Sequence, residues 1–559
     1  MRQFASVFYA MQQLLFPIAL AVFALGAYLG DSEVMLFGVL GAFLSNVIYS
    51  CYSVRDKMVF LLLHGGVFLF LLTRPLVALV DHERTWHLSS DGATQFALTL
   101  IFLSLFFLRL GVAAFYALAS RGKLFRIQNR LTGLAKDTMG ASSSRFWIFS
   151  ESNVQYVRIA SLILFAVCLI GAFVVGAQRL NYMQGRVYEE YYLASMSDYT
   201  SSYLGDLEMM LPFFLCIYLA TLPKKKLATV VLVFYIATTL PLLIIGARTD
   251  FVMAVVFAGV YYLIRDSLDG KGTWIGQKEK IIVGFGVPLG ILAMGAVNYL
   301  RADSSSLGSN GLLWLLGDAL YKQGVTFNVL GYAYEHTAEI AALGFKCYSL
   351  DPLFHNITQG FIGQTFLNLP LLPTVNSAEL ALNGHSFGNT LSYFAHPNYL
   401  GGEGYGSCYL LELNADFGYM GVIVFSFFFG MIGVVLSRLV GRNWFAGTVG
   451  LLAMFYVFHI ARGTVLEWIA FVFKTRFWMA IVVLVVFASL LAFVSLRYCV
   501  PSARRGDKAP RVNLFGIPVF AENEITKTRS GFRSVRKDLM ACPAVLRAGL
   551  EHKESEFRR

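Results

Sequence analysis

Residues 383–421 read NGHSFGNTLSYFAHPNYLGGEGYGSCYLLELNADFGYMG. This stretch is the densest collection of Gly, His, aromatic and carboxylate residues in the chain, and it ends where a long apolar run begins. Most of the remaining sequence consists of similar apolar runs. The fold is therefore decided by those runs and by the way this polar stretch leads into one of them.

The composition identifies the apolar runs as membrane helices. Of the 559 residues 57% are hydrophobic and only 14% are charged, and the mean hydropathy is +0.62. A soluble core cannot bury this much apolar surface, so the sequence predicts an all-α polytopic membrane protein.

Counting the runs gives about 12 transmembrane helices, because a helix needs about 20 apolar residues to cross the hydrocarbon core of a bilayer. The expected spans are 12–30, 34–51, 58–80, 96–119, 157–177, 207–222, 227–246, 250–264, 281–300, 418–437, 444–461 and 477–497.

Basic loops set the expected orientation, because Lys and Arg concentrate on the cytoplasmic side. The segments 121–157, 223–226, 265–280 and 438–442 are basic, and twelve crossings with both termini cytoplasmic place all of them inside. The net charge of +11 therefore marks orientation, and we expect no nucleic-acid partner.

The same count divides the chain into four parts. Residues 1–300 hold nine helices, 301–417 form a large, partly helical extracytoplasmic loop, 418–497 hold three helices, and 498–559 are a basic cytoplasmic tail. Stretches of the long loop such as 312–336 are typical of amphipathic helices at a membrane interface. Cys347 and Cys408 face outside in this arrangement and are either bridged or, more simply, two free thiols.

Several cations lie on the expected outer side, where positive residues are disfavoured. They are Arg248, Arg301, Arg462, Lys474 and Arg476. A helix-end Arg commonly reaches the lipid headgroups with its side chain, which explains most such residues. A guanidinium is also suited to binding phosphate, so we predict an anion site that uses Arg248, Arg301, Arg462 and Arg476.

Candidate acid and base groups cluster in residues 383–421. They are His385, His396, Glu403, Glu412 and Asp416. A carboxylate or an imidazole can accept the proton of an attacking hydroxyl, but a single His is more often structural, and Glu412 can equally cap a helix or pair with an Arg. Glu412 and Asp416 share one face if this segment is helical. The spacing of His, Cys and carboxylates predicts no metal site and no cofactor.

Glycine and tyrosine residues give weaker signals. Glycines 401, 402, 404 and 406 would let a ligand approach the backbone, but they equally suit a flexible connector. The Tyr residues of 178–206 suit sugar rings, although anchoring at the interface is their default role.

The end of the long loop carries a pattern that resembles a known family. The pattern is G-x-G-S-x-Y-L-x-E-L-x-x-D-F-G-Y-x-G, and it is formed here by Gly404, Gly406, Ser407, Tyr409, Leu410, Glu412, Leu413, Asp416, Phe417, Gly418, Tyr419 and Gly421. With Gly246-Ala247-Arg248 and Arg462-Gly463, it resembles the Wzy-type O-antigen and exopolysaccharide repeat-unit polymerases. Where we expect a Pro before the late Arg in that family, this chain has Ala461.

The resemblance implies a metal-independent, GT-C-like glycosyltransferase of the bacterial inner membrane with its active site on the periplasmic face. Such an enzyme transfers a growing glycan from undecaprenyl diphosphate to the terminal sugar hydroxyl of a lipid-linked repeat unit. Its partners would be the lipid-linked donor and acceptor, membrane lipids and a chain-length regulator.

The candidate residues acquire roles under this resemblance. The arginines 248, 301, 462 and 476 would stabilise the leaving diphosphate. Glu412 or His385, with Glu403 third, would act as the base, and Tyr405, Tyr409 and Asp416 would hold the acceptor glycan.

Two alternatives stay open at this point. A ligase of the same architecture would share the arginines and the base. A lipid-linked glycan flippase or transporter would place polar groups at mid-membrane depth, whereas the polar residues here concentrate at the expected outer surface.

Overall fold

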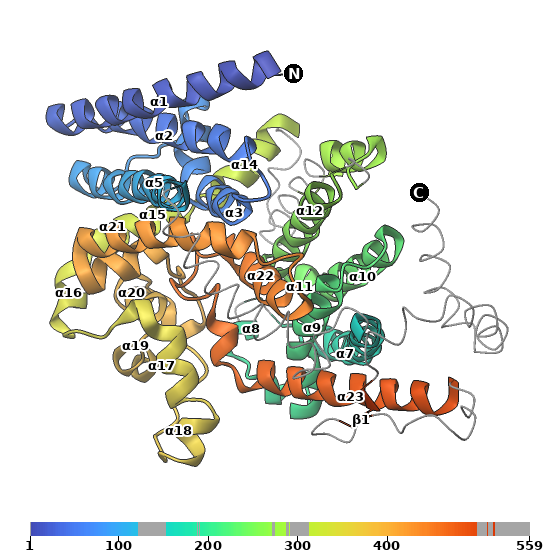
Figure 1. Cartoon of the computed structure of the whole chain (residues 1–559). Helices are drawn as coiled ribbons and strands as arrows, with labels where there is room; N and C mark the ends of the chain where they lie inside the picture. The colour runs from blue at the N-terminus through green and yellow to red at the C-terminus, as the bar shows by residue number, and fades with distance from the viewer. Residues whose placement is uncertain are drawn as a thin grey trace. The chain divides into compact units, whose positions relative to one another are not determined.

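The computed structural model describes residues 2–120, 153–186, 188, 190–270, 274–286, 290 and 312–499, together with 511–512 and 518–519. In this part of the chain the only strands are β1 (Arg511–Val512) and β2 (Pro518–Val519), which pair antiparallel. Everything else that is regular is helical (Figure 1). Ten of the helical segments are long and apolar enough to cross a membrane. The prediction of an all-α polytopic membrane protein is confirmed.

The candidate spans follow the predicted apolar runs. They are α1 (Arg2–Leu29), α2 (Ser32–Cys51), the segment formed by α3 (Met58–Val67), η1 (Phe68–Leu72) and α4 (Thr73–Val80), α5 (Asp91–Ser120), α7 (Val154–Tyr182), α9 (Ser202–Ala220), α10 (Lys225–Thr238) with α11 (Leu240–Ile245), α12 (Thr249–Asp269), α21 (Tyr409–Ser437) and α23 (Thr475–Cys499).

Two of the twelve expected spans have no counterpart among these ten. The run 281–300 lies mostly outside the described residues. The run 444–461 forms the shorter helix α22 (Trp444–Val457), because the chain turns at Phe458 and returns through the protein. In the segment that follows, Val465, Trp468 and Phe471 are buried. The expected outer loop 462–476 is thus packed against the helices.

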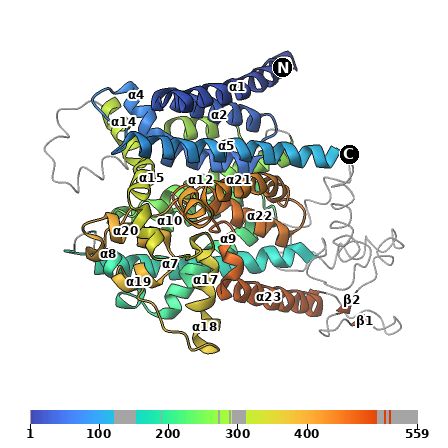
Figure 2. The same ribbon diagram turned by 90° about the vertical axis from the view of Figure 1, so that its left-hand side faces the viewer.

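The remaining elements are short. They are α8 (Glu190–Leu193), η4 (Met196–Asp198), α14 (Leu312–Gln323), α15 (Thr326–Glu335), α16 (Thr337–Ala342), η6 (Tyr348–Leu350), α17 (Asp351–Thr358), α18 (Phe361–Thr365), α19 (Ala378–Asn383), α20 (Phe387–Ala395), η7 (Tyr399–Gly401) and η8 (Ala470–Phe473). Most of them belong to the long loop, whose described residues are partly helical, as predicted. Helices α16 to α20 lie together on one side of the unit (Figures 1 and 2). Within this group α20 packs against α16 and α19, α17 packs against α18 and η6, and η6 contacts α21.

The chain divides into two compact units. The first is Met1–Leu124 with Leu162–Ala480, and the second is Phe125–Ser161 with Ile481–Arg559. Most of the second unit, including most of the basic tail expected at 498–559, lies outside the described residues. All contacts discussed below are within the first unit.

Helix α21 begins earlier than the apolar run predicts. It starts at Tyr409, so the last residues expected in the loop are helical, and Glu412 and Asp416 lie on its first two turns. The helix is interrupted at Gly418, whose backbone is left-handed (φ 61°, ψ −159°). A side chain is disfavoured there, so this glycine allows the kink between the loop part and the membrane part of α21.

Close packing of α21 against α5 holds the centre of the unit together. Gly111 of α5 lies against the carbonyl oxygen of Phe427, and Gly430 of α21 lies against that of Leu108. Small residues let membrane helices approach this closely, which is how such helices associate in lipid. The two backbones touch where any larger residue would separate them.

A single π-helical turn interrupts the third span. Residues 68–72 form η1 between α3 and α4. Before it, α3 packs against α21 and α22, and after it, α4 packs against α14. Such turns insert one residue into an α-helix and are frequent at functional sites. Phe70 within this turn reaches the region of the pocket described below.

Cys347 and Cys408 are both free. The hypothesis of a bridge between them is therefore wrong, and the simpler alternative of two free thiols holds. Cys408 is fully buried at the start of α21.

Candidate functional site

A pocket of about 1160 Å³ lies within the first unit. Its walls come from five separate parts of the chain: the tyrosines around α8, the middle of α9, the beginning of α17, helix α20 with the glycine-rich segment 402–407, and the segment 456–476. Residues 383–421 therefore supply only one of these walls. The others come from segments far away in the sequence.

Arg462 provides a cation in this pocket. In the described part of the chain the Tyr188 and Tyr192 hydroxyls lie near Arg462, and no carboxylate forms an ion pair with it. Its guanidinium carbon also lies 5.9 Å from the centre of the Phe70 ring. Burial lowers the pKa of Arg462 from its ordinary value, because the charge is partly removed from water. A cation held in this way is ready to bind an anion.

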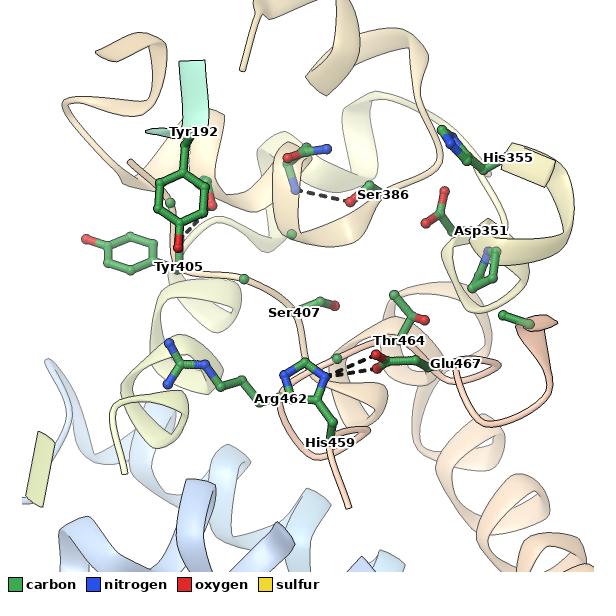
Figure 3. A pocket seen from close by; sticks show the side chains of 18 of the residues that line it. Tyr192, Asp351, His355, Ser386, Tyr405, Ser407, His459, Arg462, Thr464 and Glu467 are labelled. Atoms are coloured by element: carbon green, nitrogen blue, oxygen red, sulfur yellow. Dashed lines mark hydrogen bonds and ion pairs between the residues drawn. The ribbon is translucent and has the colours of Figure 1, made fainter. Parts of the chain in front are cut away.

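His459 lies one turn before Arg462 and is held by a carboxylate. The imidazole Nδ1 is 3.2 Å and 3.1 Å from the two carboxylate oxygens of Glu467. Figure 3 shows this pair beside Arg462, with the second ring nitrogen of His459 free of Glu467. A carboxylate that binds one imidazole nitrogen fixes the ring and leaves the other nitrogen for a ligand.

Asp351 lies on the opposite side of the pocket in Figure 3, close to His355. It is the first residue of α17 and is followed by Pro352. Burial is the largest cause that raises the pKa of Asp351, and His355 and His385 oppose it only partly. A pocket carboxyl with a raised pKa is a stronger proton acceptor than an ordinary aspartate.

Aromatic side chains line the remaining side. Tyr405 stacks on Tyr332 with ring centres 4.5 Å apart, and His396 meets Tyr405 edge to face at 4.7 Å. The Tyr188 and Tyr192 hydroxyls are hydrogen-bonded at 2.7 Å. Figure 3 places Tyr192 and Tyr405 together, away from Asp351. Aromatic faces with polar edges are suited to sugar rings.

Five of the predicted site residues line the pocket, namely His396, Glu403, Tyr405, Arg462 and Arg476. Glu403 accepts a hydrogen bond from Asn398 at 2.7 Å and is 3.3 Å from His396 Nε2. Arg476 forms an ion pair with Asp206 at 2.7 Å at the edge of the pocket.

Glu412 is fully buried away from the pocket lining. Its Oε1 accepts a hydrogen bond from the Ser407 hydroxyl at 2.7 Å, and its Oε2 accepts one from the backbone N–H of Val465 at 2.8 Å. The carboxylate thereby connects the glycine-rich segment to the segment that carries Arg462.

Asp416 and Tyr409 also make internal hydrogen bonds outside the pocket lining. Asp416 accepts from the backbone N–H groups of Tyr348 and Ser349, at 2.9 Å and 2.7 Å, just before α17 begins. The Tyr409 hydroxyl is 2.6 Å from that of Ser104 in α5. Both residues position the elements that carry the walls.

The other predicted residues lie elsewhere. His385 stacks on Phe354 and is hydrogen-bonded to the backbone oxygen of Lys346. Arg248 precedes α12 and is not among the pocket-lining residues. Arg301 lies outside the described residues.

Sequence reasoning missed Asp351, His459 and Glu467. Asp351 and His355 are four residues apart, and His459 and Glu467 lie on either side of Arg462-Gly463, so spacing offered a weak signal. Within the described residues, no three His, Cys, Asp or Glu side chains gather closely enough to hold a metal ion.

Comparison with known proteins gives one match. The family model described as O-antigen polysaccharide polymerase Wzy matches residues 9–492. No curated protein and no solved structure matches the chain.

Proposed function

Because this chain belongs to the O-antigen polysaccharide polymerase Wzy family, whose members are glycan-polymerising transferases, we propose that its large pocket is the place of transfer. The donor is a growing glycan on undecaprenyl diphosphate, and the acceptor is the terminal sugar hydroxyl of a lipid-linked repeat unit. The observation that carries this proposal is Arg462, a cation that lines the pocket and forms no ion pair with any carboxylate of the described residues.

Arg462 binds the leaving diphosphate. When the bond between the anomeric carbon and the phosphate oxygen breaks, negative charge grows on the diphosphate. A fixed cation in a site with little water stabilises that charge more strongly than water would. His459, oriented by Glu467, lies next to Arg462 and can donate a hydrogen bond to the same oxygens when it is protonated.

Asp351 accepts the proton of the acceptor hydroxyl. The acceptor oxygen forms a bond to the anomeric carbon, its proton passes to the Asp351 carboxylate, and the lipid diphosphate leaves with the bonding electron pair. Asp351 suits this role because it lines the pocket opposite Arg462 and because burial raises its pKa. Of the three bases predicted from the sequence, namely Glu412, His385 and Glu403, only Glu403 is among the residues that line this pocket.

The aromatic side of the pocket holds the glycan. Tyr405 and Tyr192 offer ring faces and hydroxyls to the sugars next to the reacting centre. Glu412 and Asp416 act indirectly in this arrangement, by holding the segments that carry Arg462 and Asp351. The active site faces the periplasm, and a chain-length regulator acts on the assembled enzyme.

Replacement of Arg462 tests this function. Purified protein in lipid nanodiscs is incubated with lipid-linked repeat units, and the products are separated on a gel. We expect a ladder from the unaltered protein and about 10²–10³-fold less polymer from Arg462→Ala. Arg442→Ala is the matched control, because Arg442 is exposed in the turn after α21 and away from the pocket.

Two results would contradict the proposal. A normal ladder from Arg462→Ala would remove Arg462 from the reaction. A single transferred product from the unaltered protein would identify a ligase instead of a polymerase.

A further inference from the structure

One wall of the pocket is part of a candidate membrane span. Met209, Pro212 and Phe213 of α9 line the pocket together with Ala470, Lys474 and Arg476. The same cavity that contains Arg462 therefore reaches side chains of a helix suited to lipid. Met209 is 41% exposed, so it also faces the surroundings of the protein.

The contact line between α9 and residues 470–477, which we call the α9 seam, has two kinds of contact. Phe213 packs edge to face on Phe477, with ring centres 5.5 Å apart. Asp206 and Arg476 form an ion pair of 2.7 Å, with side chains 44% and 46% exposed. Asp206, Met209 and Phe213 lie three and four residues apart, so they share one face of α9.

The cations of the pocket extend to this seam. Arg462, Lys474 and Arg476 all line the cavity, and Arg476 lies at the seam itself. In a polyprenyl diphosphate the charged group is attached directly to the apolar chain. A ligand whose diphosphate contacts Arg476 therefore places the start of its chain beside the seam.

We propose that the α9 seam is the binding site for the polyprenyl chain of the donor lipid, and that the Asp206–Arg476 ion pair closes it when no lipid is bound. This rests on the proposed function. On entry of the lipid, Arg476 exchanges the Asp206 carboxylate for a phosphate oxygen. The exchange costs little because an exposed ion pair contributes little to stability. Pro212 lacks a backbone N–H and leaves α9 easier to bend at this point.

Photocrosslinking tests the binding site. Met209 is replaced by the photoreactive residue p-benzoylphenylalanine in the full-length protein, and radiolabelled undecaprenyl diphosphate is the probe. The control places the same residue at Val233 in α10, which is 58% exposed but does not line the pocket. We expect at least tenfold more label at position 209, and excess unlabelled undecaprenyl diphosphate should remove it. Equal labelling at both positions, or labelling that the competitor does not reduce, would overturn the site.

A reversible crosslink tests the closing ion pair. In a background with the native cysteines replaced by serine, Asp206→Cys and Arg476→Cys are combined and joined by a short bis-methanethiosulfonate reagent, which reductant removes. Polymer formation and photolabelling at position 209 are compared between the crosslinked form and the reduced form of the same double variant, because loss of Arg476 itself lowers activity. We expect at least a tenfold loss of both on crosslinking and recovery with reductant, whereas each single variant should not respond to the reagent. Polymer formation and labelling in the crosslinked form equal to those of its reduced form would show that the seam need not open.

The outcomes separate this inference from the function on which it rests. If Arg462→Ala abolishes polymer but the crosslinked protein stays active, the seam proposal fails alone. If Arg462→Ala polymerises normally, the proposed function itself fails, whatever the crosslink does.

Discussion

At the scale of single residues, Asp351 should set the acid limb of the activity profile. As a base it must be ionised, and its pKa is raised, so activity should be lost on acidification at a higher pH than for an ordinary aspartate. Asp351→Asn should reduce polymer about 10²–10⁴-fold and remove that limb from the residual rate. Polymer formation measured over a series of pH values checks this.

The control for Asp351 is Glu379→Gln, because Glu379 is an exposed carboxylate of the same loop and does not line the pocket. It should leave both the rate and the pH profile unchanged. An Asp351→Asn protein with the normal rate and the normal acid limb would exclude Asp351 as the base.

Replacement of Glu412 should lower the stability of the fold, and any loss of polymer formation should follow from that loss of stability. Glu412→Ala leaves the Val465 N–H and the Ser407 hydroxyl without their acceptor, at a cost of about 1–3 kcal/mol for each group. Glu412→Gln should be milder, because an amide can accept from Val465 and donate to Ser407. Thermal unfolding in detergent, measured beside polymer formation, tests this order.

The same experiment also tests the prediction from the sequence that Glu412 is the catalytic base. If Glu412→Gln unfolds at the temperature of the unaltered protein but makes no polymer, then Glu412 takes part in the reaction itself. Loss of activity that follows loss of stability would agree with its buried position.

At the scale of secondary-structure elements, the contact between α5 and α21 should be sensitive to added volume. In Gly111→Ala the new methyl group would meet the carbonyl oxygen of Phe427, so the helices must separate. We expect a destabilisation of about 1–3 kcal/mol, seen as a lower unfolding temperature.

Gly259→Ala in α12 is the matched control. No atom lies within 4 Å of a methyl group added there, and alanine favours a helix more than glycine does. It should leave the unfolding temperature the same or slightly higher. Equal losses in both variants would mean that the close approach of α5 and α21 does not matter.

The sequence predicted the positions of the helices better than it predicted the residues of the site. Apolar length predicts where α2, α5 and α10 lie, because a membrane helix must satisfy its own backbone in lipid. It did not predict the early start of α21 or the return of the chain after α22, because both depend on burial against other helices. The sequence suggested Glu412 as a base because no sequence pattern indicates that Ser407 and Val465 bind its carboxylate in the fold.

At the scale of the whole molecule, the site is assembled from segments that are distant in sequence. Arg462 was predicted because a cation on the expected outer side needs an explanation, and it does line the pocket. Asp351 and Glu467 were missed, because only the tertiary fold brings α17 and the segment after α22 to the same cavity.

The orientation in the membrane stays a prediction that labelling can test. Glu379 should lie outside and Arg442 inside, because the loops around Arg442 and Lys224 are basic. Both residues are exposed, so each can be replaced by Cys in a cysteine-free background. A membrane-impermeant maleimide applied to spheroplasts should label position 379 and spare position 442. The reverse pattern would invert the topology and move the proposed site to the cytoplasm.

The π-helical turn at 68–72 has a consequence for rotational register. One residue of an α-helix corresponds to a rotation of about 100°. Deleting one residue within this turn would restore a regular helix of nearly the same hydrophobic length, but it would rotate α4 away from α14 or α3 away from α21 and α22. This span should therefore tolerate substitutions of one apolar residue for another far better than any change in its length.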